Sequence, residues 1–392
     1  MADLLTLEAA IAAVLARSAR LPEERVALGE AAGRVLAEPA RALVDLPPFA
    51  SSAMDGFALR SADTPGRLPV VARIAAGSPA ARALRPGEAM GIATGGVVPE
   101  GADAVVPIER VVSTDDSIDV PDPVSQNDNV RARGGDAREG DVVLEAGMRL
   151  GAAQIGALAA AGIPDVVCAR RPRVAVLATG SELRAPGEKL EPGEIYEANG
   201  AMLEAALCAH GADVDRLAPA RDDEGAHREA LARALESDVV VSSGGVSVGP
   251  HDLVRRVAAE LGVEEVFWRV AVKPGKPISF GVRDETLVFG LPGNPVSTLV
   301  GFELFVRPAL RALEGERDPG PRFRQAPLAR PVRRNVARDE LVRARWQEGV
   351  LETLGGQESH MIVRAAVADA LVLVPRGDGE LAGEVSYLPL GY

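Results

Sequence analysis

The sequence has 392 residues, of which 47% are apolar and 25% are charged, and a chain of this length predicts roughly two to three domains, or more if some are small. Its 43 Lys and Arg residues against 56 Asp and Glu residues give a formal net charge of −13. This balance argues against nucleic acid as the main partner, because nucleic-acid binding depends on neutralising phosphates. Aromatic residues are only 3% of the chain, so platforms for stacking bases are not expected.

The two cysteines, Cys168 and Cys208, form no CxxC pair and fit a reducing cytosol. The N-terminal segment carries Asp3 and Glu8 and lacks the basic start of a signal peptide. No apolar run approaches the roughly 18 residues that a membrane span requires. We therefore expect a cytoplasmic protein that contacts no membrane.

The first half of the chain predicts one helix followed by an irregular β segment. Thr6 can cap the helix, and Leu7, Ile11 and Val14 follow at helical spacing, so its apolar face must pack on another element. Residues 42–139 are rich in Pro, Gly and short β-branched runs, with turn signals about every ten residues. This pattern is typical of short strands joined by turns.

Residues 171–312 alternate apolar runs with helical stretches, which predicts a mostly parallel sheet covered by helices on both faces. The predicted strands are Val174–Ala178, Val214–Ala218, Val239–Val241, Val266–Val272 and Leu287–Leu291. Asp318–Pro321 reads as a linker. Beyond it, residues 322–392 show short alternating runs that predict a small β domain.

In open α/β sheets, ligands bind beyond the carboxyl ends of the strands, so the residues after each predicted strand sample the site. Glycines and hydroxyls there leave backbone N–H groups free to hold phosphate-like anions, and lysines add positive charge. The candidates are Thr179, Gly180 and Glu182 after the first strand, Asp222 after the second, Ser243, Gly244, Gly245, Ser247 and Asp252 after the third, Lys273 and Lys276 after the fourth, and Pro292, Gly293, Asn294 and Pro295 after the fifth.

Three carboxylates at this edge, Glu182, Asp222 and Asp252, can hold a hard divalent cation. Mg²⁺ usually takes one or two carboxylates together with phosphate oxygens. The combination predicts a Mg²⁺–nucleotide or pyrophosphate site. Any single loop is as well explained by an ordinary turn with solvated acids, but five loops at one edge favour a ligand site.

Several other sites are disfavoured by the motifs. The chain lacks GxxxxGK[ST], GxGxxG and HExxH, so a P-loop NTPase, a Rossmann dehydrogenase and a histidine-ligated catalytic zinc are not supported. Gly245–Gly249 fits the GxSxG pattern of α/β-hydrolases. That motif needs a downstream acid and then a histidine, and His251 lies too close in sequence to be the usual partner.

The N-terminal half contains its own unusual strings. Pro47–Ala58 places small polar residues before Met-Asp-Gly, which indicates an ordered loop with an outward carboxylate at Asp55. Ala93–Gly96, with Thr94, and the string that ends at Asp136 are similar. Spacing alone leaves open whether these are functional loops or tight turns capped by Asp.

Taken together, these strings are similar to a known family. SSAMDGFA, ATGGVVPEGADAVVPIE, RPRVAVLATGSEL, SSGGVSVGPHD, KPGKP and GLPGNPVS occur in the order seen in molybdopterin molybdenumtransferases, the MoeA proteins and the E-domain of gephyrin. The resemblance extends from about Leu7 into the last domain and is loose after about residue 320.

The resemblance implies insertion of molybdenum from molybdate into adenylylated molybdopterin, with release of AMP and assistance from Mg²⁺. It implies that Glu182, Asp222 and Asp252 act on metal and substrate, and that Lys273 and Lys276 bind the anions. Gly244, Gly245 and Ser247 would line the substrate phosphates, and Pro292 and Pro295 would shape the loop on the molybdate side. Asp55, Thr94 and Asp136 match family positions on a second lobe.

The implied architecture is a multidomain α/β protein with a central molybdopterin-binding domain, an irregular β lobe and a small β-barrel-like C-terminal domain. The implied divisions are 1–19 with 171–312, 20–41 with 140–170 for connection and dimerisation, 42–139 for the lobe, and 313–392. The family forms elongated homodimers, so Asp55, Thr94 and Asp136 are expected to act on the partner subunit. Contact with a molybdopterin adenylyltransferase is a further expected interaction.

The sequence departs from the family pattern at three places: Gly134–Gly135 before Asp136, Ser181 before Glu182, and Glu197 where the family often has Asp. The first two leave the key acids in place, whereas the longer side chain leaves a role for Glu197 open. Two alternatives remain, a molybdopterin adenylyltransferase, which lacks the Met-Asp-Gly lobe, and a dimeric scaffold without catalysis. A group of arginines in the last domain is interpreted as a solvated face, with contact to an acidic partner left open: Arg330, Arg333, Arg334, Arg338, Arg343 and Arg345.

Overall fold

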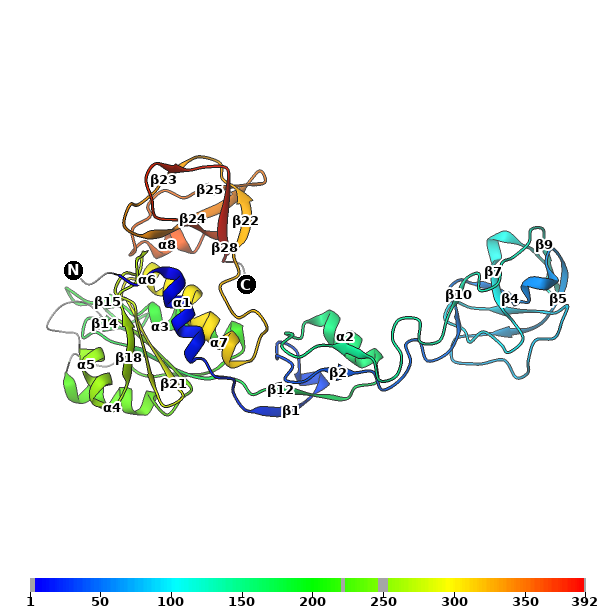
Figure 1. Ribbon diagram of the computed structural model, residues 1–392, viewed down its shortest axis with the longest axis horizontal. Helices are drawn as coiled ribbons and strands as arrows, with labels where there is room; N and C mark the ends of the chain where they lie inside the picture. The colour runs from blue at the N-terminus through cyan, green and yellow to red at the C-terminus, as the bar shows by residue number, and fades with distance from the viewer. Residues whose placement is uncertain (1–3, 220–222, 246–252, 391–392) are drawn as a thin grey trace.

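The computed structural model describes residues 4–219, 223–245 and 253–390. The chain is elongated, with an α/β unit and the C-terminal β unit at one end, a small connecting unit in the middle and a β-rich lobe at the far end (Figure 1). It is therefore a multidomain α/β protein, as predicted. No helix of the described residues is long and apolar enough to cross a bilayer.

The helices are distributed over three of these units. They are α1 (Leu7–Arg17), α2 (Ala152–Ala160), α3 (Asn199–His210), α4 (Glu224–Ala234), α5 (Leu253–Glu260), α6 (Pro295–Gly301), α7 (Arg307–Leu313) and α8 (Ile362–Ala365). Short 3-10 helices lie at Leu28–Glu30, Ser61–Asp63 and Ile108–Arg110, and a π-helical turn, Phe302–Val306, joins α6 to α7.

The α/β unit contains a six-stranded sheet, which positions the predicted site loops. Its order is β16 (Asp213–Arg216), β13 (Arg173–Ala178), β17 (Val239–Ser243), β21 (Thr286–Leu291), β20 (Ser279–Arg283) and β18 (Glu264–Trp268). The first four strands are parallel, and β20 is antiparallel to both of its neighbours. A small parallel pair, β14 (Leu183–Arg184) and β15 (Ile195–Tyr196), lies beside this sheet.

The predicted strand Val266–Val272 is wrong as a single element. The backbone of Arg269 has a positive φ of 74°, which ends β18 at Trp268. Farther on, β19 (Val272–Lys273) pairs with the C-terminal sheet instead. The segment between β18 and β20 is too short to contain a helical crossover, so β20 returns antiparallel to β18. Because β20 is also antiparallel to β21, β18 and β21 run in the same direction.

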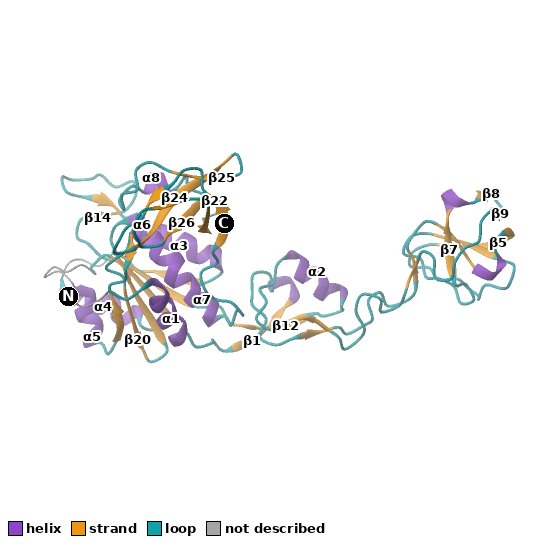
Figure 2. Ribbon diagram, turned by 45° about the horizontal axis from the view of Figure 1, so that its top comes forward, coloured by secondary structure: helices purple, strands orange, loops and turns teal. Residues whose placement is uncertain are grey.

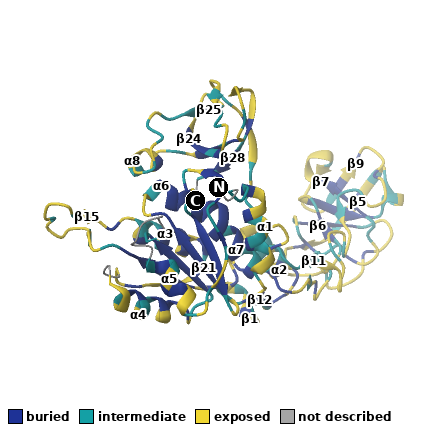
Figure 3. Cartoon of the chain, turned by 60° about the vertical axis from the view of Figure 1, so that its left-hand side comes forward, coloured by how far each residue is buried: buried dark blue, intermediate teal, exposed yellow. Residues whose placement is uncertain are grey.

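Helices cover both faces of this sheet (Figure 2). On one face, Leu7, Ala10 and Val14 of α1 are buried in the main core, and α1 packs against α7. Thr6 accepts a hydrogen bond from the N–H of Ala9 as the cap of α1. The predicted docking of the N-terminal helix is thereby confirmed. On the other face, α4 and α5 cover a second core. Of the central strands, β17 is buried throughout and β13 is buried from Val174 to Ala178 (Figure 3).

The connecting unit packs α2 on two short antiparallel pairs, β1 (Glu23–Ala27) with β12 (Asp165–Ala169) and β2 (Ala40–Arg41) with β11 (Val142–Leu144). The distal lobe has sheet order β7 (Ala104–Pro107), β4 (Gly56–Leu59), β6 (Ala89–Ile92), β5 (Gly66–Ile74), β9 (Ser117–Val120) and β8 (Val112–Ser113). The pair β3 (Ser51–Ser52) and β10 (Val130–Arg131) lies where the chain enters and leaves this lobe.

The C-terminal sheet has order β19, β24 (Asp339–Gln347), β26 (Ala370–Val374), β28 (Glu384–Pro389) and β22 (Arg324–Pro327). A further strand, β25 (Val350–Thr353), pairs with the end of β24. β23 (Val332–Arg333) and β27 (Glu380–Leu381) form a separate pair. A single bridge between Leu328 and Leu351 links the β22 and β25 ends of the sheet. This unit also receives β19 from the α/β part of the chain, which ties the two together.

A buried ionic cluster joins the connecting unit to the α/β unit. Arg149 pairs with Glu314 and Glu316 and donates to the carbonyl of Gly33. His210, at the end of α3, lies 2.9 Å from the Glu314 carboxylate. Burial raises the pKa of Glu314, but the hydrogen bond with His210 and the charge of Arg149 outweigh burial and hold that pKa below its usual 4.5. The junction therefore depends on compensated charge rather than on apolar contact alone.

Asp238 anchors the amino-terminal end of the sheet. Its carboxylate accepts two hydrogen bonds from the Arg170 guanidinium, at 2.6 and 2.7 Å, and one from the backbone N–H of Arg173 at 2.8 Å. Burial raises the pKa of this carboxyl group, but the hydrogen bonds from Arg170 and Arg173 prevail and lower it to about 2. One side chain thus ties the start of β17 to the start of β13.

We expect Asp238→Asn to lower the free energy of unfolding by about 2 kcal/mol near neutral pH, as for other hydrogen bonds to charged groups. Because the folded-state pKa is depressed, this contribution is present above the ordinary pKa of 3.8 and fades as the pH falls toward 2. Urea titrations of both proteins at a series of pH values test this. Asp284→Asn, at an exposed position, is the matched control, and a deficit that did not shrink in acid would contradict the assignment.

Candidate active site

The loops that follow β13, β17 and β21 are joined to one another at the carboxyl edge of the sheet. The N–H of Thr179 donates to the carbonyl of Ser243 at 3.0 Å, and the N–H of Gly244 donates to the carbonyl of Leu291 at 3.0 Å. Ser243 is buried and Gly244 is partly exposed. The structure therefore brings three of the predicted loops into one edge.

Gly244 is required by the close approach of two of these loops. Its φ is +92°, and a Cβ placed on it would lie 2.7 Å from the carbonyl oxygen of Thr179. Since the obstacle is backbone, a side chain there has no cheap way to fit. The glycine identified from the sequence thus has a structural reason, and its N–H is engaged by the carbonyl of Leu291.

Asn199 is a site residue to which sequence reasoning assigned no role. Its side-chain N–H₂ donates to Ser243 Oγ at 2.8 Å and to the carbonyl of Gly293 at 2.7 Å, which couples two loops. Its Oδ1 atom is buried and has no hydrogen-bond partner among the described residues. A buried acceptor without a donor is costly, so Oδ1 is suited to a donor on a ligand. The position of Asn199 at the start of α3, between two polar loops, was its only signal in the sequence.

The loop Pro292–Pro295 is braced from two sides. Thr298 Oγ1 donates to the carbonyl of Pro292 at 2.6 Å, and Pro295 begins α6. Asn294 donates to Ser359 Oγ at 2.9 Å, and the N–H of Val296 donates to the carbonyl of Ser359 at 3.0 Å. The C-terminal unit thus reaches the edge through Ser359, a residue that the sequence analysis did not single out.

The loop that carries Ser359 is held by a buried arginine. Arg343 of β24 is 1% exposed, and its guanidinium donates to the carbonyls of Gly356, Glu358 and Met361. Five N–H donors in one rigid fork suit an arginine to this task. Of the arginines that the sequence interpretation placed on a solvated face, Arg343 is buried and Arg334 and Arg338 are only partly exposed.

Glu182 presents an exposed carboxylate beside Gly180, where the backbone φ is +147°. That carboxylate forms no hydrogen bond or ion pair with a described residue. Next to it is a cavity of about 550 Å³, lined in part by Gly180, Arg184 and Arg216. Glu182 is therefore available to a cation or a substrate.

Glu197, whose role the sequence left open, is a structural residue. It is 3% exposed and accepts a hydrogen bond from the N–H of Gly200 at 2.6 Å. It also pairs with Arg216 of β16 at 2.6 Å. The longer arm of Glu allows one carboxylate to cap α3 and to reach the neighbouring strand. Both of its oxygens are thereby engaged within the fold.

The two lysines of the KPGKP loop differ in their surroundings. Lys273 Nζ lies 3.0 Å from Glu340 of β24, so part of its charge is compensated. Lys276 is exposed and makes no ion pair with a described residue. Because β18 runs in the same direction as β21, the loop begins at the same edge as the others. Of the two lysines, Lys276 is therefore the one whose positive charge is free to bind an anion.

Three predicted residues, Asp222, Ser247 and Asp252, lie outside the described residues. Within residues 4–219, 223–245 and 253–390, no group of three or more His, Cys, Asp or Glu side chains is arranged to hold a metal ion. Of the predicted metal ligands, the structure thus describes Glu182 alone. The magnesium site stays a prediction.

Asp55 and Thr94 meet in the distal lobe. The Asp55 carboxylate accepts hydrogen bonds from the N–H of Thr94 at 2.7 Å and from its hydroxyl at 3.1 Å. These two bonds lower the pKa of Asp55 despite some burial. At Gly56, a Cβ would collide with the carbonyl of Val106, so the Met-Asp-Gly string needs its glycine. Both site residues are exposed and held by the lobe itself.

Asp136 lies at the base of the lobe, where its N–H donates to the carbonyl of Leu46 at 2.9 Å. Its carboxylate is exposed and makes no hydrogen bond with a described residue. The lobe and the α/β unit stand at opposite ends of the chain (Figure 1). Within one chain, Asp55, Thr94 and Asp136 are therefore not brought to the edge that carries Glu182 and Lys276.

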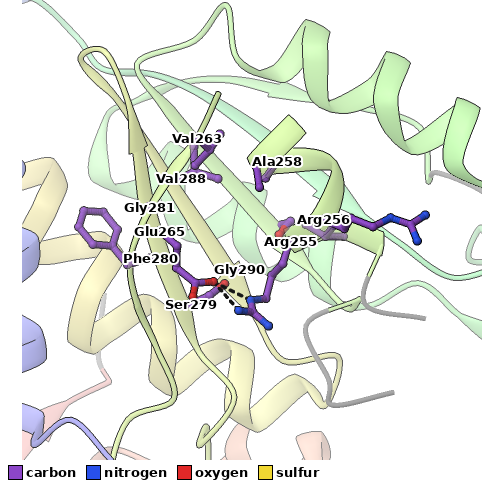
Figure 4. A pocket seen from close by; sticks show the side chains of 13 residues that line it. Arg255, Arg256, Ala258, Val263, Glu265, Ser279, Phe280, Gly281, Val288 and Gly290 are labelled. Atoms are coloured by element: carbon purple, nitrogen blue, oxygen red, sulfur yellow. Dashed lines mark hydrogen bonds and ion pairs between the residues drawn. The ribbon is translucent and has the colours of Figure 1, made fainter. Parts of the chain in front are cut away.

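A cavity of about 410 Å³ opens between α5 and the strands β18, β20 and β21 (Figure 4). Val263, Ala258 and Val288 form much of its wall, and an ion pair of 2.6 Å joins Arg255 to Glu265 at its rim. None of the predicted site residues that the structure describes lines it. It is a gap between helix and sheet rather than part of the edge site.

We expect Gly244→Ala to lower the free energy of unfolding by about 1–3 kcal/mol, because the new Cβ must displace the Thr179 backbone at a left-handed position. Gly29→Ala is the matched control, since a Cβ there meets nothing within 4 Å. Chemical denaturation of both variants measures the difference. Equal stability of the two would show that the edge loops shift without cost.

The chain matches three family profiles along its length. The MoeA N-terminal region (domain I and II) matches residues 5–162, a probable molybdopterin binding domain matches 175–312, and the MoeA C-terminal region (domain IV) matches 325–389. These matches cover the distal lobe, the sheet with its loops, and the unit that contributes Ser359.

Relatives of known name are similar over nearly the full length. Molybdopterin molybdenumtransferase 2 of Mycobacterium tuberculosis is 38% identical over 374 residues, which is 91% of this chain and 92% of the relative. Molybdopterin molybdenumtransferase of Staphylococcus aureus is 33% identical over 380 residues, 94% of this chain and 91% of the relative. A crystal structure of a molybdopterin biosynthesis MoeA protein from Pyrococcus horikoshii aligns with a TM-score of 0.86 at 29% identity, covering 98% of this chain and 99% of that one.

Proposed function

The chain belongs to the molybdopterin molybdenumtransferase family, and from this premise we propose that it inserts molybdenum from molybdate into adenylylated molybdopterin and releases AMP. One observation carries the proposal most directly. The motif residues Thr179, Ser243–Gly244 and Pro292–Asn294 converge on one edge, cross-linked by hydrogen bonds, and the exposed Lys276 follows a strand that ends at the same edge. Such an edge suits a substrate with a pyrophosphate and an oxyanion.

The proposed chemistry is positioning and charge neutralisation rather than covalent catalysis. Backbone N–H groups of the glycine loops and the ammonium of Lys276 hold the phosphates and the negative charge that develops on them. The unpartnered Oδ1 of Asn199 accepts a hydrogen bond from a donor on the substrate. These groups are held by the sheet, so little reorganisation accompanies the reaction.

We further propose that Glu182, Asp222 and Asp252 hold Mg²⁺. The exposed, unpartnered carboxylate of Glu182 fits a hard cation, which prefers carboxylate oxygens. When bound, Mg²⁺ would supply polarisation of the phosphoanhydride. The role of this chain's carboxylates is then to orient the ion beside the glycine loops.

We also propose that the active form is a homodimer in which Asp55, Thr94 and Asp136 complete the site of the partner subunit. The distance between lobe and sheet edge within one chain supports this arrangement (Figure 1). The Asp55 carboxylate, preorganised by Thr94 and exposed, is suited to reach a second chain. A contact with the adenylyltransferase that supplies the substrate is part of the same proposal.

Release of AMP from adenylylated molybdopterin tests the function. We expect release to require both molybdate and Mg²⁺, and Lys276→Ala to reduce its rate by about 10²–10³-fold, as when one donor to developing charge is removed. Lys189→Ala, at a side chain 89% exposed, is the matched control. Formation of adenylylated molybdopterin from ATP would instead identify an adenylyltransferase, and substrate binding without either reaction would leave a scaffold.

Mixing two inactive variants tests the action between subunits. Asp55→Asn and Glu182→Gln are each expected to be inactive alone. After unfolding and refolding together, about a quarter of wild-type activity should return, since half of the dimers are mixed and each holds one intact site of two. Failure to recover activity, with mixed dimers demonstrated by mass, would place Asp55 and Glu182 in the site of one chain or in separate roles.

A further inference from the structure

A second polar cavity, of about 320 Å³, lies where α7 meets the last strand of the C-terminal unit. Its walls carry four arginines, Arg307, Arg311, Arg322 and Arg324, and one acid, Glu303. Figures 1 and 2 place α7 on the side of the α/β unit that faces the connecting unit, away from β14 and β15 near the candidate site. The volume lies within the range of small-molecule pockets.

The acids near this cavity are already engaged. Glu303 forms two hydrogen bonds of 2.8 Å with Arg307. Glu316 pairs with Arg322 and also with Arg149 of the connecting unit, and it lies 3.9 Å from Arg311. Two carboxylates therefore serve this group of arginines, and one of them is shared with the domain junction.

Arg324 lacks a compensating carboxylate. It lies at the start of β22 and is exposed, and its side chain makes no hydrogen bond or ion pair with any described residue. Arg324 is one of the residues that line the cavity. Arg324 thus brings hydrogen-bond donors to the cavity that have no acceptor among the described residues.

Arg311 is largely shielded from solvent, with little opposite charge close to it. Its side chain is 14% exposed, and its guanidinium donates to the carbonyl of Gly320 at 3.1 Å. Burial, followed by the positive charge of Arg322, lowers the pKa of Arg311 to about 10. At the junction the opposite holds, because Glu314 and Glu316 outweigh burial and raise the pKa of Arg149. Arg311 therefore has less compensating negative charge around it than Arg149 has.

We propose that this arginine cavity binds a dianionic tetrahedral oxyanion, either free or as the phosphate group of a small organic monoester. Guanidinium forks match such oxygens in pairs, and the bond is charge-assisted. Leu388 and Leu390 form an apolar part of the wall, which suits the organic portion of an ester. This cavity is a second binding site, separate from the candidate active site at the sheet edge.

Calorimetric titration of the full chain at constant ionic strength tests the proposal, with phenyl phosphate, inorganic phosphate and sulfate as probes. We expect binding to the wild type and on the order of tenfold weaker binding to Arg324→Gln, as for loss of one charge-assisted donor. Arg324 has no partner in the described fold, so this change should leave stability intact. Arg333→Gln, at an exposed arginine of the same unit outside the cavity, is the matched control and should bind normally.

Comparing the probes identifies the kind of ligand, and a second variant identifies the site at which it binds. Tighter binding of phenyl phosphate than of inorganic phosphate supports an ester, and equal binding supports a free oxyanion. The part of the binding heat that Arg324→Gln removes should persist in Lys276→Ala, because Lys276 lies outside the arginine cavity. Binding that is lost with Lys276→Ala but kept with Arg324→Gln would put the anion at the sheet edge and overturn the proposal, as would absence of heat with every probe. Because the readout is binding, it stands apart from any failure to release AMP.

Discussion

Parallel pairing of β13, β17 and β21 is the constraint on which the candidate site depends. Each strand of a parallel set ends at the same edge, so the loops that leave them must share space there. The hydrogen bonds from Thr179 to Ser243 and from Gly244 to Leu291 continue the sheet by one step into these loops. A glycine at 244 is what lets two backbones approach closely enough for those bonds. The loops at this edge are therefore held in place by the sheet itself.

The C-terminal unit is part of this edge rather than an appendage. It receives β19 from the chain segment that carries Lys273, and Glu340 of the neighbouring strand pairs with that lysine. Through Ser359 it also braces Asn294. The buried Arg343 holds the loop of Ser359 in place. Loss of packing in this unit would consequently disturb the edge from outside the sheet.

Charge is distributed unevenly over the long molecule. At the junction with the connecting unit, Arg149, His210, Glu314 and Glu316 balance one another in a buried cluster. A short way along the chain, the arginine cavity around Arg311 has more positive than negative groups. Buried charge is tolerated only when it is compensated. The first cluster is thus suited to hold two units together, and the second to receive an anion from solution.

Local structure and local chemistry could be predicted from the amino-acid sequence. The periodicity of Leu7–Val14 predicted a docking helix, and the glycines, hydroxyls and lysines after the apolar runs predicted the edge loops, because strand ends and turns are encoded by neighbours along the chain. Family strings such as SSGGVSVGPHD and GLPGNPVS added the implied reaction. These features depend on short-range patterns that any one segment carries.

Other features of the fold and of the site depend on contacts between segments that are distant in the sequence. The run Val266–Val272 divides because Arg269 turns out of the strand and β19 finds a better partner in β24. Asn199 and Ser359 enter the site through bonds to loops far from them in sequence. The carboxylate of Glu197 accepts a hydrogen bond at the start of α3 and forms an ion pair with Arg216. Asp55 stands at the far end of its own chain, since two connecting segments extend the lobe away from the sheet. No local pattern encodes these placements, because each results from packing between segments that meet only in the folded chain.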